Sequence, residues 1–466
     1  MASPPPRPVE EPPASEEVAP PPGLPSPGWS RAQLLAFSTT FVAYAACYLA
    51  RNNAAVAKSV LSTAGLSDLT MGNLDAAFLI AYTAGSFALG SVTDRLGAWP
   101  ALAGGLLGSG LCQGGLALLG TTEAAPLAAF YALNGLFQSI LYPACKKIMG
   151  DNFDASKGRG AALGGWSTCY YLGSIASTAL ASHLLATYHG AGPDSWRVVF
   201  MAPALVLPLL ALATVPVRAA LEAETRAETG TAATPRLAPL PAVASSSHQV
   251  LVAPSTADSD GADHWLGYPP AIWMTALSYA LVKCTRYAFL LWLPLYLVAD
   301  VHLSFQQAAF TAALFDVGSV GGSLLGGVLS DRLGQQAGLC TALLAPLAAI
   351  LCALPVVADS TSPAALPVAI LALGLCIGGA ETLQGAVAPL RYSSPHRRAA
   401  SVGFVNGWGS VGTVVAAPAI PAVAAAVGGI QHAFSLLGPL AAMAGAVTFL
   451  QWAVYDAKDS RDVEQQ

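Results

Sequence analysis

Two positive charges stand in the middle of an apolar stretch in the second half of the chain. Lys283 and Arg286 lie within residues 270–299, which are otherwise mostly apolar. A stretch of this length can cross a bilayer, which needs about 20 mostly apolar residues. A Lys or Arg near the centre of a span costs on the order of 3 kcal/mol on insertion scales, so such residues usually face a polar cavity and have a partner.

The polar residues around these cations share one face of the predicted helix, because they recur at i, i+3 or i+4 spacing. The face consists of Tyr279, Lys283, Arg286, Tyr287 and Leu290. A stripe with two positive charges predicts a role in handling an anion. The alternative is that both cations pair with acidic residues of neighbouring spans or reach toward the membrane surface.

The composition indicates a polytopic membrane protein. Apolar residues make up 54% of the 466 residues and charged residues only 10%, whereas an ordinary soluble domain is about 25% charged. The chain has no basic field for nucleic acid. Its eight cysteines lie in apolar segments without metal-type spacing, which argues against a disulfide framework or a zinc site. We expect no cofactor and no enzymatic activity, since no nucleophile, metal cluster or cofactor loop is present.

We predict an all-α membrane protein with twelve transmembrane helices in two pseudo-symmetric six-helix bundles, because only helices satisfy their own backbone in lipid at these lengths. The predicted spans are residues 32–60, 71–92, 98–120, 125–149, 160–187, 197–217, 269–299, 305–330, 337–358, 364–390, 399–427 and 431–455. The predicted regions are a disordered tail (1–30), the first bundle (31–217), a flexible linker rich in Ala, Thr, Ser, Pro and Glu (218–265), the second bundle (266–456) and a short tail (457–466).

Lys and Arg residues are concentrated on one side of the predicted membrane when both termini share that side. The positive-inside rule then places both termini, the linker and the tails in the cytoplasm. The last residues, 461–466, contain no dilysine retrieval signal. The sequence leaves the endoplasmic reticulum, the plasma membrane and the plastid envelope open as locations.

An eight-residue pattern, GxxxDRLG, occurs once in each half of the chain, at residues 90–97 and 327–334. Arg51 precedes Asp94 of the first copy by 43 residues, and Arg286 precedes Asp331 of the second by 45. The two arginines therefore occupy equivalent positions in two duplicated halves. This register predicts that both face one site between the halves.

Parallel six-span repeats are typical of the major facilitator superfamily, whose substrate site lies near mid-membrane between the halves. The two GxxxDRLG copies resemble the signature of that superfamily between its second and third spans. The resemblance implies that Asp94, Arg95, Asp331 and Arg332 lie at the cytoplasmic face. There we expect them to stabilise one conformation, as gating residues, and not to contact substrate.

Three spans resemble the organophosphate:phosphate antiporter family, which includes bacterial glycerol-3-phosphate and hexose-phosphate transporters and eukaryotic sugar-phosphate exchangers. The similar segments are YAACYLARNN (44–53), NGLFQ followed by YPACK (134–138 and 142–146), and RYAFLLWLPLYL (286–297). Further similarity to the eukaryotic subgroup lies at 74–79 and 314–318.

By position, the resemblance implies that Arg51 and Arg286 bind phosphate. It also implies a lining of aromatic residues and lysines, namely Tyr44, Tyr48, Tyr82, Tyr170, Lys283 and Lys146. Tyr170 stands where bacterial members have a substrate-contacting His, so that a neutral phenol replaces a titratable group. Lys283 supplies charge where Ser86 replaces a bacterial Lys, and Lys146 alternatively lies at the membrane interface.

Guanidinium groups bind phosphate oxygens through paired hydrogen bonds. Two arginines at one site would be neutralised by a doubly charged phosphate, whereas the empty site would resist closing over unpaired charge. We therefore expect a transporter that exchanges a phosphorylated sugar or glycerol-3-phosphate for inorganic phosphate by alternating access. We expect the protein to lie in the lipid bilayer as a monomer.

Two other functions fit the same sequence. A proton-coupled symporter of a sugar or organic anion would use Glu381, Asp75 or Asp316 as the proton carrier, although Glu381 also suits a structural ion pair. A receptor or scaffold that kept the fold would show no flux and would tolerate loss of both arginines.

Overall fold

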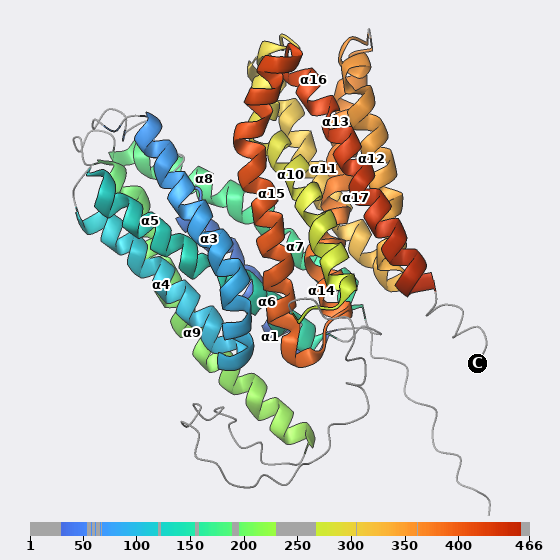
Figure 1. Ribbon diagram of the computed structural model, residues 1–466. Coiled ribbons are helices and arrows are strands. Elements are labelled where there is room, and N and C mark those ends of the chain that lie inside the picture. Colours follow the sequence, from blue (N-terminus) through green and yellow to red (C-terminus); the bar gives the residue numbers. More distant parts are fainter. Residues whose placement is uncertain are drawn as a thin grey trace, which may run out of the picture.

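A computed structural model describes residues 29–53, 57, 61, 66, 68–119, 123–153, 158–188, 195–229, 267–303, 305–360 and 362–457. Within these residues all regular structure is helical. Figure 1 shows the helices of the first half gathered on one side and those of the second half on the other. Most of the predicted tails and most of the predicted linker lie outside the described residues.

The first half holds α1 (Arg31–Cys47), the 3-10 turn η1 (Tyr48–Ala50), α3 (Asp68–Leu96), α4 (Ala98–Leu119), α5 (Ala124–Ser139), α6 (Leu141–Asn152), α7 (Arg159–Ser167), α8 (Cys169–Tyr188), η3 (Ser195–Arg197) and α9 (Val198–Thr229). The second half holds α10 (Pro270–Ala299), α11 (Phe305–Leu333), α12 (Gln336–Ala358), α13 (Ala365–Thr382), the π-helical turn η4 (Leu383–Val387), α14 (Ala388–Arg391), η5 (Pro395–Arg397), α15 (Arg398–Val427), α16 (Ile430–Ser435), α17 (Leu437–Gln451) and the π-helical turn η6 (Trp452–Asp456).

Each of the twelve predicted ranges contains helix. Among the described residues, nine helices are long and apolar enough to cross a membrane. Several helix ends differ from the predicted bounds by a few residues, and α9 differs most: it continues through residues assigned to the linker and ends at Thr229. The added segment is rich in Ala and Glu, which favour helix. An ion pair between Arg218 and Glu222, 2.7 Å apart at i, i+4 spacing, also supports it.

The predicted first span, 32–60, is not one continuous helix. The α-helix ends at Cys47, a 3-10 turn follows, and Arg51 and Asn52 lie in a turn before helix resumes at Asn53. A break of this kind frees backbone carbonyls that must find other donors inside a membrane protein.

Side chains of three other helices supply those donors. The carbonyl of Ala50 accepts hydrogen bonds from Gln113 at 3.1 Å, Asn134 at 2.9 Å and Gln138 at 3.3 Å. The carbonyl of Tyr48 accepts one from the hydroxyl of Ser177 at 2.8 Å. The break thus depends on α4, α5 and α8, which places Arg51 at a fixed point between helices.

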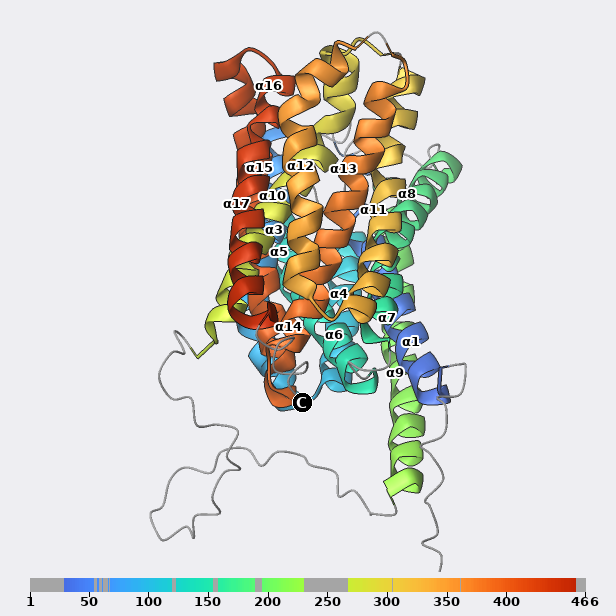
Figure 2. The ribbon, with the colours of Figure 1, turned by 90° about the vertical axis from the view of Figure 1, so that its right-hand side faces the viewer.

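The two halves meet at one end of the molecule, which we call the linker end because α9 ends there and α1 and α10 begin there (Figure 2). Glycines allow the helices to approach closely there. A Cβ on Gly90 of α3 would lie 2.6 Å from the carbonyl oxygen of Ala399 at the start of α15.

The same packing recurs between α7 and α11. A Cβ on Gly160 would lie 2.6 Å from the carbonyl oxygen of Gly327. Each of these two contacts joins a helix of the first half to a helix of the second half. The same close packing therefore occurs twice between the halves.

The aspartates of the two GxxxDRLG copies cap helices of the opposite half. Asp94 accepts hydrogen bonds from the backbone N–H groups of Ala399 and Ala400, at 3.2 and 2.7 Å, in the first turn of α15. Asp331 accepts from the N–H groups of Gly160 and Ala161, at 2.7 and 2.6 Å, in the first turn of α7. A carboxylate at a helix N-terminus satisfies free donors and complements the helix dipole.

Candidate functional site

A cavity of about 610 Å³ lies between the two halves, within the size range of ligand sites. It is bounded toward the linker end by the helix contacts described above. Along α3 the lining residues Asp75, Phe78 and Tyr82 come first, and Ser86 and Asp94, which bond to the other half, follow nearer the linker end. In Figure 1 the two halves diverge toward the opposite end.

Most of the predicted binding residues meet in this cavity. Its lining includes Tyr44, Tyr48, Arg51, Tyr82, Tyr170, Lys283 and Arg286. The whole predicted face of the seventh span is also present, since Tyr279, Tyr287 and Leu290 line the cavity too. The helical spacing of that span therefore identified the residues that face the cavity.

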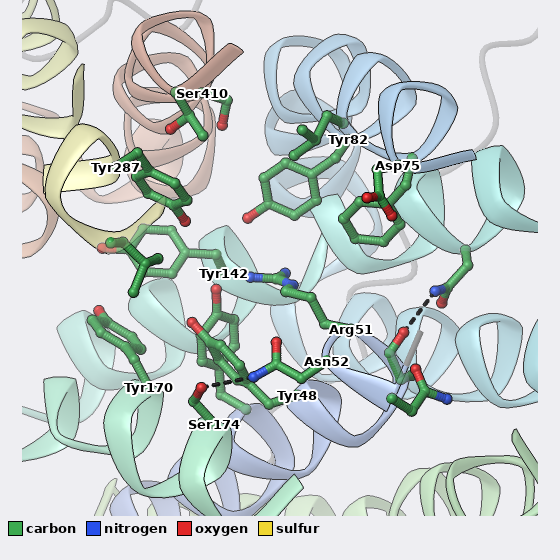
Figure 3. A pocket seen from close by; sticks show the side chains of 18 of the residues that line it. Tyr48, Arg51, Asn52, Asp75, Tyr82, Tyr142, Tyr170, Ser174, Tyr287 and Ser410 are labelled. Atoms are coloured by element: carbon green, nitrogen blue, oxygen red, sulfur yellow. Dashed lines mark hydrogen bonds between the residues drawn. The ribbon is translucent and has the colours of Figure 1, made fainter. Parts of the chain in front are cut away.

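Arg51 enters the cavity from the helix break of the first half. Its Nε donates a hydrogen bond to Oε1 of Gln138 at 3.0 Å. Its guanidinium carbon lies 5.0 Å from the ring centres of both Tyr48 and Tyr82, positions favourable for a cation–π contact. Its buried Nη2 has no hydrogen-bond partner among the described residues. Figure 3 shows Arg51 reaching into the space between Tyr82 and Tyr142.

Arg286 enters from α10 of the second half and is held differently. Its Nη1 forms an ion pair with Oε2 of Glu381 from α13. Its guanidinium carbon lies 5.0 Å from the ring centre of Tyr171 of the first half. Arg286 and Glu381 are 8% and 7% exposed, and both line the cavity together with Asp316 of α11.

Lys283 begins a chain of hydrogen bonds that crosses between the halves. Its Nζ donates to Oδ1 of Asn406 at 3.1 Å. The amide of Asn406 in turn donates to the hydroxyls of Tyr82 and Ser86 of α3, each at 3.3 Å. Because the ring of Tyr82 also covers Arg51, this chain connects Lys283 with the surroundings of Arg51.

The family described as Major Facilitator Superfamily matches residues 40–257 and 275–465, which is most of the chain. The chain belongs to the major facilitator superfamily. As a member it is an integral multi-pass membrane protein, and the predicted all-helical fold is confirmed.

Solved structures of facilitator proteins share this fold at low sequence identity. The fucose transporter FucP in its outward conformation matches with a TM-score of 0.64 and 15% identity, over 90% of this chain and 99% of that one. The human organic anion transporter MFSD10 matches with a TM-score of 0.63 and 14% identity, over 90% of this chain and all of that one. At these identities the likeness concerns the fold alone.

Relatives by sequence include facilitators named for phosphorylated solutes. A protein of Arabidopsis thaliana named for glycerol-3-phosphate transport is 30% identical over 66% of this chain and 63% of its own length. The glucose-6-phosphate exchanger SLC37A2 of Xenopus laevis is 28% identical over 59% and 57%. The glycerol-3-phosphate transporter of Haemophilus influenzae is 27% identical over 66% and 64%. The matched part therefore spans less than two thirds of the length of these relatives. Their names agree with the resemblance seen in the first, fourth and seventh spans.

One predicted binding residue of this facilitator lies away from the cavity. Lys146 of α6 is fully buried, and its Nζ lies 3.9 Å from the ring centre of Trp166 and 5.4 Å from that of Tyr142. It is absent from the cavity lining. The prediction that Lys146 lines the site is wrong for this conformation, because the helix turns its ammonium group onto Trp166 in the helix packing.

The four predicted gating residues divide into two kinds. Asp94 and Asp331 make the hydrogen bonds between halves described above. Arg95 and Arg332 are exposed at the linker end, and within the described residues they take no part in those bonds. The gating role itself remains a prediction for all four.

Sequence reasoning missed several lining residues, because none of them carries a charge, and Tyr142 was noted only as part of the YPACK segment. Four of these lie in helices of both halves: Tyr142, Tyr171, Asn406 and Ser410. Tyr142 donates a hydrogen bond to the carbonyl of Gly385 in the other half at 2.9 Å, and it lies at the base of the cavity. Asn406, a lone amide within an otherwise apolar helix, carried a signal that could have been used, since such residues need buried partners.

Proposed function

We propose that this facilitator exchanges a phosphorylated sugar or glycerol-3-phosphate for inorganic phosphate by alternating access. The cavity presents three cations, Arg51, Lys283 and Arg286, from both halves. Guanidinium and ammonium groups are the usual ligands of phosphate oxygens. The names of the relatives support the same class of solute.

The main support for this proposal is the set of interactions that Arg51 makes. Its guanidinium lies in the cavity and pairs with no carboxylate among the described residues, and its buried Nη2 has no hydrogen-bond partner among them. Leaving a buried charge without a counter-ion is costly. A phosphate group in the cavity would supply both the negative charge and the missing acceptor.

Alternating access would follow from the helix contacts at the linker end. The capping bonds of Asp94 and Asp331 hold that end closed in this conformation, and their release would let the halves rock about the cavity. With both termini in the cytoplasm, as the distribution of Lys and Arg predicts, the present conformation opens away from the cytoplasm.

Exchange in phosphate-loaded proteoliposomes tests the proposal. Efflux of radiolabelled phosphate would be followed with external phosphate, glycerol-3-phosphate, glucose-6-phosphate or sulfate, for the wild type and for Arg286→Ala. We expect efflux that requires an external phosphate compound and is lost in the variant, since loss of Arg286 leaves the Glu381 carboxylate unpaired in the site.

Two outcomes would contradict the exchange function. Uptake of an unphosphorylated sugar driven by a pH gradient, without phosphate efflux, would favour the symporter, for which Asp75, Asp316 and Glu381 line the cavity. Absence of flux with every solute would favour a receptor or scaffold.

A further inference from the structure

One carboxylate of the cavity, that of Glu381, forms an ion pair with Arg286, which is predicted to bind phosphate. We propose that Glu381 is a specificity-determining residue: it holds Arg286 so that the phosphate group is anchored at Arg51 and Lys283, while the Glu381–Arg286 pair recognises hydroxyl groups of the organic part. This inference rests on the proposed exchange function and adds an orientation and a basis for selectivity.

The ion pair between Arg286 and Glu381 makes the two arginines unequal. Arg51 is bonded to a neutral amide and covered by aromatic rings, whereas Arg286 already has a negative partner. A phosphate approaching Arg286 would have to displace Glu381 or share the arginine with it. Two anions a few ångströms apart repel each other strongly in a partly desolvated site. The phosphate group is therefore favoured at Arg51.

Lys283 belongs to the Arg51 side of this arrangement. Its hydrogen bond to Asn406, and that of Asn406 to Tyr82, connect it with the aromatic rings around Arg51. Arg51 and Lys283 together offer two positive charges, which match the charge of a doubly ionised phosphate. The positive charge of Arg286 is balanced inside the protein.

The Glu381–Arg286 pair suits hydroxyl groups better than phosphate. A carboxylate accepts hydrogen bonds from hydroxyls and a guanidinium donates to them, so the pair can serve a polyol or sugar without a change of net charge. Inorganic phosphate bound at Arg51 leaves these groups unused. The pair therefore favours an organophosphate over inorganic phosphate, because only the organic part reaches it.

The variant Glu381→Gln tests this role, since glutamine keeps the size of the side chain and removes its charge. Half-saturation of phosphate exchange by external inorganic phosphate and by glucose-6-phosphate would be measured in proteoliposomes. We expect the concentration of inorganic phosphate that half-saturates exchange to fall at least tenfold, because Arg286 becomes free to bind phosphate. The preference for glucose-6-phosphate over inorganic phosphate should fall by at least the same factor.

Glu381→Asp is the matched control, because it retains the carboxylate. Its substrate preference should lie within about threefold of the wild type, while thermal unfolding in detergent checks that both variants are folded. An unchanged preference in a folded Glu381→Gln, or an equal change in Glu381→Asp, would overturn the proposal and leave exchange itself intact.

The double variant Arg286→Ala/Glu381→Gln distinguishes this arrangement from a site in which both arginines bind the phosphate equally. Here inorganic phosphate exchange should recover at least tenfold relative to Arg286→Ala alone, because the repelling carboxylate is gone and Arg51 remains. A double variant as inactive as Arg286→Ala would overturn the assignment of phosphate to Arg51. Failure of the wild type to exchange any phosphate compound would instead refute the proposed function.

Discussion

Arg51 and Arg286 face one cavity from equivalent positions of the two halves, and of the two only Arg286 is paired with a carboxylate among the described residues. Duplication therefore preserved the positions of the arginines and not their partners. The difference makes the cavity asymmetric. One wall carries an arginine that has no carboxylate partner among the described residues, and the other carries an arginine neutralised by a carboxylate. It also makes substitutions at the two arginines unequal in their consequences.

Replacement of Arg51 by alanine should weaken phosphate binding without unfolding the protein. Hydrogen bonds to a charged group contribute about 1.5–3 kcal/mol, which corresponds to a roughly 10- to 150-fold rise in the dissociation constant. Binding of radiolabelled phosphate to the purified protein measures this. Arg218→Ala, at an exposed position of α9, is the control and should bind as the wild type does. Equal binding by Arg51→Ala would exclude Arg51 from the site.

Replacement of Lys283 by methionine should raise the half-saturation of exchange by phosphate about tenfold. The variant loses one positive charge and the bond to Asn406, and one charged hydrogen bond is worth about 1.5–3 kcal/mol. Cys284→Ala is the matched control, because Cys284 is the next residue of α10 and does not line the cavity. Exchange measurements that showed the same shift in both variants would point to a disturbed helix and not to a lost ligand.

Replacement of Asp94 by asparagine should open the linker end. The variant loses the charge that caps α15 through Ala399 and Ala400, a change of about 1–3 kcal/mol in favour of the separated halves. Spin labels at the exposed positions Leu96 and Leu333 report the separation by pulsed electron resonance, in a background without Cys284 and Cys352. We expect a new population at longer distance.

The control for that measurement is Asp151→Asn. Asp151 also bonds to the other half, through Arg398 at 2.7 Å, but its side chain is 42% exposed. Exposed ion pairs contribute little, about 0–1 kcal/mol. Its distance distribution should stay close to the wild type, and a shift equal to that of Asp94→Asn would argue against a special role for the helix cap.

Replacement of Gly327 by alanine should destabilise the closed linker end, because a Cβ there would overlap the carbonyl of Gly160 in α7. We expect a lower temperature of thermal unfolding and a longer distance between labels at Leu96 and Leu333. Gly321→Ala tests the same change in the same helix at a position where a Cβ meets nothing within 4 Å. That variant should be as stable as the wild type or slightly more so, since alanine favours helix.

The helical membrane architecture, and some of the residues that face the cavity, could be predicted from the sequence alone. Apolar length decides whether a segment can cross a bilayer, and helical spacing decides which side chains share a face. Both are local properties of the chain. For this reason helical spacing was enough to place Lys283 and Arg286 on one face of α10, which lines the cavity, and the repeat identified Arg51 as the counterpart of Arg286.

The pairing of polar groups depends on how the helices pack against one another. Glu381 lies 95 residues from Arg286, and Ala400 lies 306 residues from Asp94. No local pattern joins such pairs. The break before Asn53 likewise depends on amides of α4 and α5, and Lys146 is turned onto Trp166 by the packing of its own half. Buried polar groups must be satisfied by whichever helices the fold brings near them, so their pairing follows from packing and not from spacing along the chain.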